Sequence, residues 1–191
     1  MLFEFVKPIE DILTKKGIEF KTKHYKELSE QDIKKADKII ICGTSLADNE
    51  FLKNLKEFSW IKRYKKPLLG ICGGSHIIGL LFGYKLKKKR QIGLKEIVLK
   101  HEFLGIKGKI KAYHLHQFHV LPELFKKDNV YATLFHPEVR NKEMIEKYAG
   151  NLNSPIYYMS GPPQMVKSMR ELAEKIGASD NDIRFEEFTG Y

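Results

Sequence analysis

Residues 68–76 have the sequence Leu-Leu-Gly-Ile-Cys-Gly-Gly-Ser-His. The apolar run that ends at Ile71 predicts a buried strand, and the apolar run from Ser75 to Phe82, ended by Gly83, predicts a helix. Cys72 therefore stands on a sharp turn between strand and helix. On such a turn the side chain projects from the edge of the sheet, and the helix N-terminus favours a thiolate. A small buried cysteine beside a helix start would have the same local sequence.

Strands and helices alternate on both sides of this turn. Predicted strands cover residues 2–6, 20–25, 38–42, 67–71, 130–135, 156–159 and 183–188, and predicted helices cover 8–16, 29–36, 51–64, 75–82, 142–148 and 163–176. This alternation predicts an α/β fold with a doubly wound, mostly parallel sheet. Between Lys85 and Tyr113, shorter alternating segments broken by glycines predict an antiparallel extension.

The composition indicates a folded protein that resides in a reducing compartment. The chain has 191 residues, 42% of them hydrophobic, and no apolar run approaches the roughly 20 residues that span a bilayer. The N-terminus carries an acid inside its apolar run and does not resemble a signal peptide. The two cysteines, Cys42 and Cys72, lack the partners that a disulfide framework or a zinc site needs. We therefore expect a cytoplasmic protein with no membrane partner.

The net charge of +10 arises from 34 basic and 24 acidic residues. Basic residues are scattered along the chain, and only Lys85 to Arg90 forms a dense run. A solvated hairpin rim explains that run better than a phosphate-binding patch. We therefore expect no nucleic-acid partner.

A second candidate element, Leu134-Phe-His136-Pro-Glu138-Val, follows a predicted strand. A histidine base can activate a thiol, and a carboxylate two residues further along can hold the imidazole in the required tautomer. An isolated His-x-Glu is more often a surface pair. Its occurrence together with a cysteine on a strand-to-helix turn favours a catalytic triad of Cys72, His136 and Glu138.

The two elements together resemble those of class I glutamine amidotransferases. That family has Gly-x-Cys-x-Gly-x-Gln at the turn and His-Pro-Glu after a late strand, and the likeness covers residues 1–140. The resemblance implies a flavodoxin-like fold and a triad in which Cys72 is the nucleophile, His136 the base and Glu138 its orienting partner. It also implies glutamine as the substrate, ammonia passed to a separate synthetase subunit, and no cofactor or metal.

The same resemblance assigns the residues around the substrate. The backbone N–H groups of Gly73 and Thr44 would form the oxyanion hole. Gly43, His76 and His116 would line the substrate pocket. His76 stands where the family usually has glutamine, and the loop at Thr44 lacks the family's second glycine and proline. These departures leave open a binding or regulatory module that has lost glutamine turnover.

Three histidines lie close together in Tyr113-His-Leu-His116-Gln-Phe-His119. Alternate residues of a strand share a face, so this spacing would also suit a metal site. The resemblance favours a pocket-lining role for His116 over a metal, because the family carries a histidine-containing stretch ahead of a Leu-Pro pair at this place.

Residues 141–191 resemble a different family. Ser154-Pro-Ile-Tyr-Tyr-Met-Ser160-Gly-Pro-Pro and the aromatic end at Tyr191 are similar to the end of the NAD(P)-binding domain of ferredoxin reductase-like flavoproteins. The segment is too short to be a reductase, since the flavin-binding barrel and the glycine-rich nucleotide turn are missing from the sequence. We expect a β-α-β tail that extends the sheet, and a nicotinamide-nucleotide-linked oxidoreductase fragment is the alternative.

Overall fold

The computed structural model describes residues 5–120, 122–150, 157–161, 167–168, 170–171 and 183–187. Its main sheet has the strand order β1-β2-β6-β5. The strands are β1 (Ile39–Ile41), β2 (Leu68–Ile71), β6 (Val130–Thr133) and β5 (Leu124–Lys127). The first three are parallel, and β5 pairs antiparallel with β6. The predicted α/β fold with a mostly parallel sheet is confirmed.

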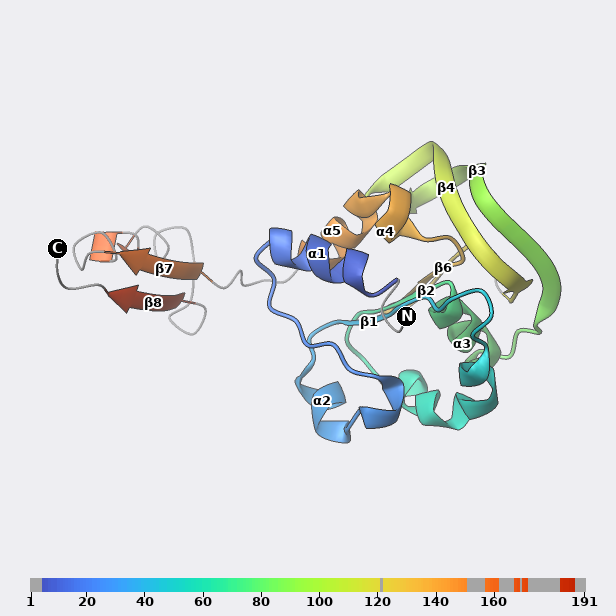
Figure 1. The fold of residues 1–191 in the computed structure, drawn as a ribbon, viewed down its shortest axis with the longest axis horizontal. Helices are drawn as coiled ribbons and strands as arrows, with labels where there is room; N and C mark the ends of the chain where they lie inside the picture. The colour runs from blue at the N-terminus through green and yellow to red at the C-terminus, as the bar shows by residue number, and fades with distance from the viewer. Residues whose placement is uncertain are drawn as a thin grey trace.

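Helices cover both faces of this sheet, as Figure 1 shows. They are α1 (Lys7–Lys15), α2 (Glu30–Lys35), the 3₁₀ helix η2 (Glu50–Lys62), α3 (Gly73–Leu81), α4 (Pro137–Arg140) and α5 (Lys142–Gly150). Leu68 belongs to the core cluster formed with η2 and α3, whereas Leu69 belongs to the cluster formed with α1 and α5. Both side chains are fully buried, and each such burial contributes about 1.5–3 kcal/mol.

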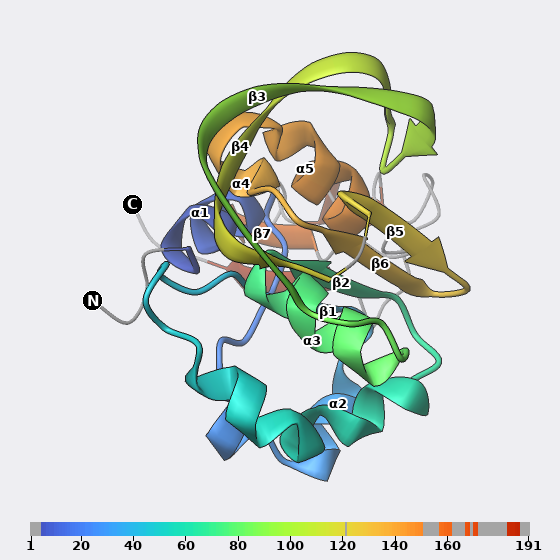
Figure 2. The same ribbon diagram turned by 90° about the vertical axis from the view of Figure 1, so that its right-hand side faces the viewer.

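A long hairpin of β3 (Lys87–Phe103) and β4 (Ile106–His119) forms a second, two-stranded sheet. The hairpin arches over α4 and α5 and descends toward α3 (Figure 2). At its far end Leu99, Phe103 and Ala112 pack against Phe135 and Met144. The predicted antiparallel strands between residues 85 and 113 are present, but the antiparallel strand that extends the main sheet is β5.

The predicted strand at residues 20–25 is wrong. Residues 18–24 have no regular structure and lead into a short 3₁₀ helix, η1 (Tyr25–Glu27). Lys21 and Lys23 instead bind the carboxylate of Asp32 at 3.3 and 2.7 Å, which holds this exposed segment on α2 and away from the sheet. The strand predicted at 2–6 lies outside the described residues except for Phe5 and Val6, which form a turn.

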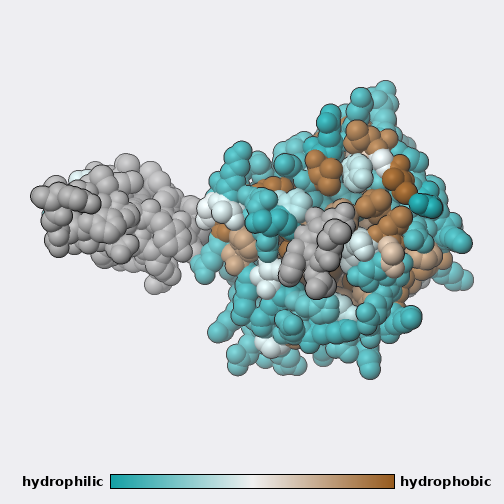
Figure 3. Space-filling view, in the orientation of Figure 1, coloured by the Kyte–Doolittle hydropathy of each residue, from teal (hydrophilic) through white to brown (hydrophobic). Residues whose placement is uncertain are grey.

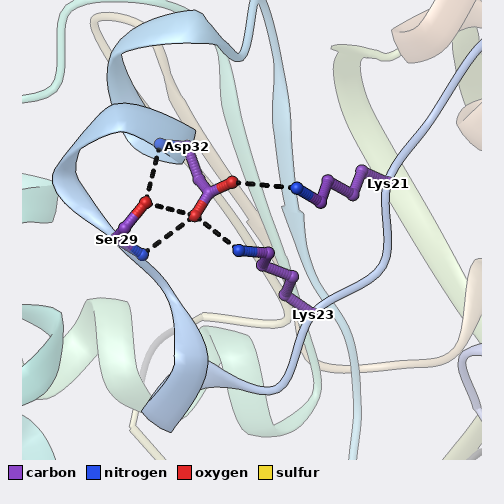
Figure 4. A network of polar contacts seen from close by, with 4 residues as sticks. All are labelled: Lys21, Lys23, Ser29 and Asp32. Carbon is purple, nitrogen blue, oxygen red and sulfur yellow. Dashed lines mark hydrogen bonds and ion pairs between the residues drawn. The ribbon is translucent and has the colours of Figure 1, made fainter.

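The capping box predicted from Ser29 and Asp32 is confirmed (Figure 4). The Asp32 backbone N–H donates to the Ser29 hydroxyl oxygen at 3.2 Å, and the Asp32 carboxylate accepts from the Ser29 N–H at 3.0 Å. The hydrogen bond from Lys23 and those from Ser29 hold the pKa of Asp32 well below its usual range. One carboxylate thus caps α2 and anchors the segment before it.

The C-terminal strands β7 (Tyr157–Gly161) and β8 (Ile183–Glu187) pair in parallel with each other. Among the described residues, neither strand pairs with the main sheet, so the expected sheet extension by residues 141–191 is not found there. Residues 167–168 and 170–171 are helical, and the rest of the helix predicted at 163–176 lies outside the described residues. The division of the chain at residue 140 stays a prediction.

In the described part of the chain, no helix has the length and apolar character needed to cross a membrane.

Candidate active site

Cys72 lies on a strained turn between β2 and α3. Its backbone has φ +47° and ψ −98°, a left-handed conformation that side-chain-bearing residues rarely adopt. The turn is held by a hydrogen bond from the Cys72 N–H to the Thr133 carbonyl at 2.8 Å and by the His76 N–H, which donates to the Cys72 carbonyl at 3.1 Å. Strain of this kind is typical of a nucleophile elbow.

Two glycines permit this turn because neighbouring atoms leave no room for a side chain. A Cβ atom at Gly74 would overlap the carbonyl oxygen of Ile41, and one at Gly70 would lie 2.7 Å from the Gly74 backbone. Close approach of β1, β2 and α3 therefore depends on glycine at both positions.

His136 and Glu138 form a buried pair at the start of α4. The His136 Nδ1 lies 2.7 Å from Glu138 Oε1, and both side chains are withdrawn from solvent. Because a carboxylate only accepts, Nδ1 carries a proton, and Nε2 is the ring nitrogen left for another partner. Burial opposes a charge on the ring, but hydrogen bonds and charges of Cys72 and Glu138 outweigh it and raise the pKa of His136 to about 10.

Gly43 fills the narrow space between Cys72 and His136. A Cβ atom at this position would lie 2.6 Å from His136 Cε1 and 3.4 Å from Cys72 Cβ. The structure thus brings together both elements of the predicted triad, with the loop after β1 packed against them.

The two predicted oxyanion-hole residues are also neighbours. A Cβ atom at Gly73 would lie 3.3 Å from the hydroxyl oxygen of Thr44. That hydroxyl donates to the Asp48 carbonyl at 3.0 Å, which closes the loop after β1. Gly73 opens α3, where backbone N–H groups without helical acceptors are available to an anion.

Strand β4 contacts every part of this site. The Leu115 carbonyl accepts from the Cys72 thiol at 3.5 Å, and the Tyr113 carbonyl accepts from the His136 N–H at 2.8 Å. Gln117 donates to the carbonyl of Leu46 at 3.0 Å, in the loop that holds Thr44. These contacts are made largely by backbone atoms, so no pattern of side chains signals them.

Aromatic rings surround His136. Phe5 lies with its ring centroid 4.3 Å from that of His136, and Tyr113 lies edge-on at 6.4 Å. Phe5 precedes α1 and is buried, so the N-terminal turn closes one side of the imidazole. Sequence reasoning missed Phe5, although its place in an apolar run ahead of a proline-started helix was visible.

His76 is buried beside the turn and has a defined tautomer. Its Nε2 lies 2.8 Å from the Phe118 carbonyl, which only accepts, so Nε2 carries the proton. Burial lowers the pKa of His76, and the ring is neutral at pH 7. Nδ1 is therefore a lone-pair acceptor, and it has no hydrogen-bond partner within the described residues.

The histidines of β4 form a neutral cluster. The His114 Nδ1 and the His116 Nε2 lie 3.3 Å apart, and the rings of His116 and His76 are 6.5 Å apart at 85°. Burial, together with nearby positive charges, lowers the pKa of His114 to about 4, of His116 to about 3 and of His119 to about 4. In the part of the chain that the structure describes, no three His, Cys, Asp or Glu side chains are arranged to hold a metal ion.

Cys42 is a free thiol with a different environment. Burial, reinforced by the negative charges of Glu138 and Glu10, raises its pKa to about 12. A thiol of this kind stays protonated at neutral pH and is a poor nucleophile.

Comparison with known proteins identifies the family. Residues 3–134 match the family model described as glutamine amidotransferase class-I, and the chain belongs to this family. The matched region contains the turn at Cys72 and ends two residues before His136. Amidotransferase or amide-hydrolase activity is the general activity of the family.

Individual relatives agree with this assignment. Imidazole glycerol phosphate synthase subunit HisH 1 of Campylobacter jejuni is 29% identical over an alignment of 154 residues. The match covers 56% of this chain and 76% of that subunit. A crystal structure described as a GMP synthase subunit from Thermoplasma acidophilum aligns with a TM-score of 0.67 at 21% identity, over 88% of this chain and 92% of that one. A glutamine amidotransferase from Thermotoga maritima aligns with a TM-score of 0.51 at 16% identity, over 90% and 79%. At these identities the two structures support the fold alone.

Proposed function

We propose that this chain hydrolyses the side-chain amide of glutamine, with Cys72 as nucleophile, His136 as general base and acid, and Glu138 as the residue that orients the imidazole. The observation that carries this proposal is the buried 2.7 Å hydrogen bond between His136 and Glu138, next to a cysteine on a strained strand-to-helix turn. A buried pair of this kind is costly unless its charge is used or compensated.

The reaction has two stages, the formation of a thioester and its hydrolysis. The proton of the Cys72 thiol is held on Nε2 of His136, whose raised pKa favours the charged ring, and the sulfur attacks the amide carbon of glutamine. The amide nitrogen of the tetrahedral intermediate then takes that proton and leaves as ammonia. A γ-glutamyl thioester remains on Cys72. Water, deprotonated by His136, hydrolyses the thioester and yields glutamate and the free thiol.

The negative oxygen of each intermediate needs hydrogen-bond donors. The N–H groups of Gly73 and Thr44 serve this purpose in our proposal, since both residues lie together at the N-terminus of α3. Gly43, His76 and His116 line the pocket for the rest of the substrate. The free Nδ1 lone pair of His76 then accepts a hydrogen bond from a substrate N–H group.

The ammonia passes to a separate synthetase partner in this proposal. One relative is named as a subunit of imidazole glycerol phosphate synthase, which supports a partner in general. Two free cysteines are consistent with a cytoplasmic location. Free ammonia is released to solvent when the partner is absent.

The thioester provides the test. Wild type and Cys42→Ser are mixed with glutamine, quenched in acid and measured as intact proteins by mass spectrometry. A γ-glutamyl adduct on both proteins, mapped to Cys72 and absent from Cys72→Ser, is the expected result. An adduct on Cys42, or none with glutamine under any condition, overturns the proposal.

A second candidate is a binding or regulatory module on the same fold. It is favoured by His76 in the place of the family's glutamine and by the altered loop at Thr44. Such a module binds glutamine without releasing ammonia, so calorimetric binding that persists in the absence of any turnover identifies it.

The resemblance of residues 141–191 to a nicotinamide-nucleotide domain gives a third, separate hypothesis. It predicts that millimolar NADH or NADPH raises the melting temperature of the protein. An unchanged melting temperature rejects it.

A further inference from the structure

The β3–β4 hairpin has two faces of opposite character. Its inner face packs on the body through Leu99, Phe103 and Ala112. On the outer face, Ile92, Leu94 and Val98 are 48%, 55% and 65% exposed, although all three are aliphatic. Exposed aliphatic residues on one face of a sheet are unusual in a protein that acts alone.

Residues of β4 complete this outer face. Ile92 pairs with Leu115 and Leu94 pairs with Tyr113, and directly paired residues share a face, so the face continues onto β4 as far as the ring of Tyr113 beside His136. Both partners are half-buried. Apolar surface is visible on the side of the molecule where β3 and β4 lie (Figure 3).

The hairpin also carries most of the net charge of the chain. Residues 85–111 contain ten basic and two acidic residues, a net charge of +8 in a chain whose net charge is +10. Lys109 and Lys111 stand opposite Val98 and Glu96 on the outer face, so basic groups border the aliphatic centre. An apolar centre with a charged rim is the usual anatomy of a protein interface.

We propose that the outer face of the β3–β4 hairpin is the docking surface for a protein partner whose contact face is acidic around an apolar centre. The opposite charge steers and orients that partner. Nucleic acid fits this face less well. The exposed centre is aliphatic, whereas proteins that bind single-stranded nucleic acid stack the bases on aromatic side chains. The proposal rests on the proposed function, since that partner is the synthetase that receives the ammonia.

The strand next to this face also contacts the site. Leu115 and Tyr113 of β4 are the cross-strand partners of Ile92 and Leu94. Their carbonyls accept hydrogen bonds from the Cys72 thiol and the His136 N–H, respectively. Gln117 of the same strand holds the loop at Thr44 through Leu46. A partner seated on the hairpin therefore lies beside the strand that contacts all three.

The test uses the full chain with photoreactive p-benzoylphenylalanine at position 94, or at position 20 as an exposed aromatic control. The protein cross-linked in cells of the source organism is identified and purified, and its binding is measured by calorimetry. We expect Leu94→Glu and Lys111→Glu to weaken binding by roughly tenfold or more. The matched controls Phe20→Glu and Lys53→Glu leave it unchanged. Basal ammonia release by Leu94→Glu equals that of wild type, so a loss of binding in this variant is a loss of docking.

The proposal is overturned if position 20 cross-links as readily as position 94, or if Leu94→Glu binds the purified partner as wild type does. It is also overturned if a single-stranded RNA or duplex DNA oligonucleotide binds the hairpin and only Lys111→Glu weakens that binding. Cys72→Ala separates this proposal from the proposed function. Loss of ammonia release in Cys72→Ala with no effect of the hairpin variants rejects docking alone, whereas hairpin-dependent binding with full activity of Cys72→Ala rejects the triad alone.

Discussion

The thiol of Cys72 donates a hydrogen bond to the carbonyl of Leu115 at 3.5 Å. The proposed nucleophile is thus held by the backbone of β4, which also contacts His136 through the carbonyl of Tyr113. The hairpin therefore belongs to the site as much as the main sheet does, and the geometry of the sulfur depends on where β4 lies.

Thiol alkylation distinguishes the two cysteines. We expect iodoacetamide at about pH 7.5 to modify Cys72 and leave Cys42 unmodified, because burial raises the pKa of Cys42 to about 12 and keeps its thiol protonated. Peptide mapping by mass spectrometry measures the modification. The Cys42→Ser variant is still labelled at Cys72. The His136→Asn variant is labelled more slowly, because it lacks the proposed base. Equal labelling of both thiols would contradict this assignment.

Gly43→Ala should inactivate the site with little effect on folding. The added methyl group would lie 2.6 Å from His136 Cε1 and must displace the ring. Gly150→Ala is the matched control, since no atom of the described residues lies within 4 Å of the corresponding position. We expect ammonia release to fall by roughly 100-fold or more in Gly43→Ala, because small displacements of a catalytic group have large effects on rate. Full activity of Gly43→Ala would mean that His136 is not in use.

Glu138→Gln should reduce ammonia release by roughly 100-fold or more and lower the pKa of His136, since the carboxylate helps to hold its charge. A raised pKa in the folded state stabilises the protein below about pH 6.5, the ordinary histidine value, and this contribution is lost as the pH rises toward about 10. Denaturant unfolding of both proteins between pH 6 and 10 measures it. The gap in unfolding free energy between them should narrow with rising pH, and a constant gap would argue against the charged pair.

The neutral histidines of β4 should make the protein sensitive to acid. Their pKa values are lowered to about 4 for His114 and about 3 for His116, so stability present above pH 6.5 is lost as the pH falls toward 4. Melting temperatures at pH 7 and pH 5 measure this loss. His116→Asn should show a smaller difference between the two pH values than wild type, and an equal difference would place the acid sensitivity elsewhere.

His76→Gln tests the pocket. The substitution restores the residue that the family usually has at this position, and glutamine can both donate and accept, whereas the Nδ1 of His76 only accepts. If His76 limits the use of glutamine, kcat/KM for glutamine rises in the variant. A large loss of kcat/KM would instead show that this chain is adapted to its histidine and to a substrate that supplies a donor there.

The core of the fold is predictable from the sequence because that core rests on local patterns. The apolar run of β2, the glycine-flanked turn at Cys72 and the capping box at Ser29 are each encoded within a few residues. The segment at residues 20–25 has the alternation of a strand, yet ion pairs of Lys21 and Lys23 with Asp32 hold it elsewhere. Long-range pairing of side chains is not visible in a local pattern.

The side chains of the candidate site are predictable from the sequence, whereas its backbone contacts are not. Two short motifs indicate Cys72, His136 and Glu138, and the structure brings these motifs together around Gly43. The carbonyls of Tyr113 and Leu115 escape prediction, because any residue supplies the same carbonyl and only the path of the chain decides where it points. The packing of Phe5 on His136 depends on the path of the chain in the same way.

Ammonia release from glutamine tests whether Cys72 is the catalytic nucleophile. Purified wild type, Cys72→Ala and Cys42→Ala are compared at equal concentration in a coupled assay, with circular dichroism to show that all three are folded. We expect wild type and Cys42→Ala to release ammonia at the same rate and Cys72→Ala to release none above background. Equal release by wild type and Cys72→Ala would contradict the account.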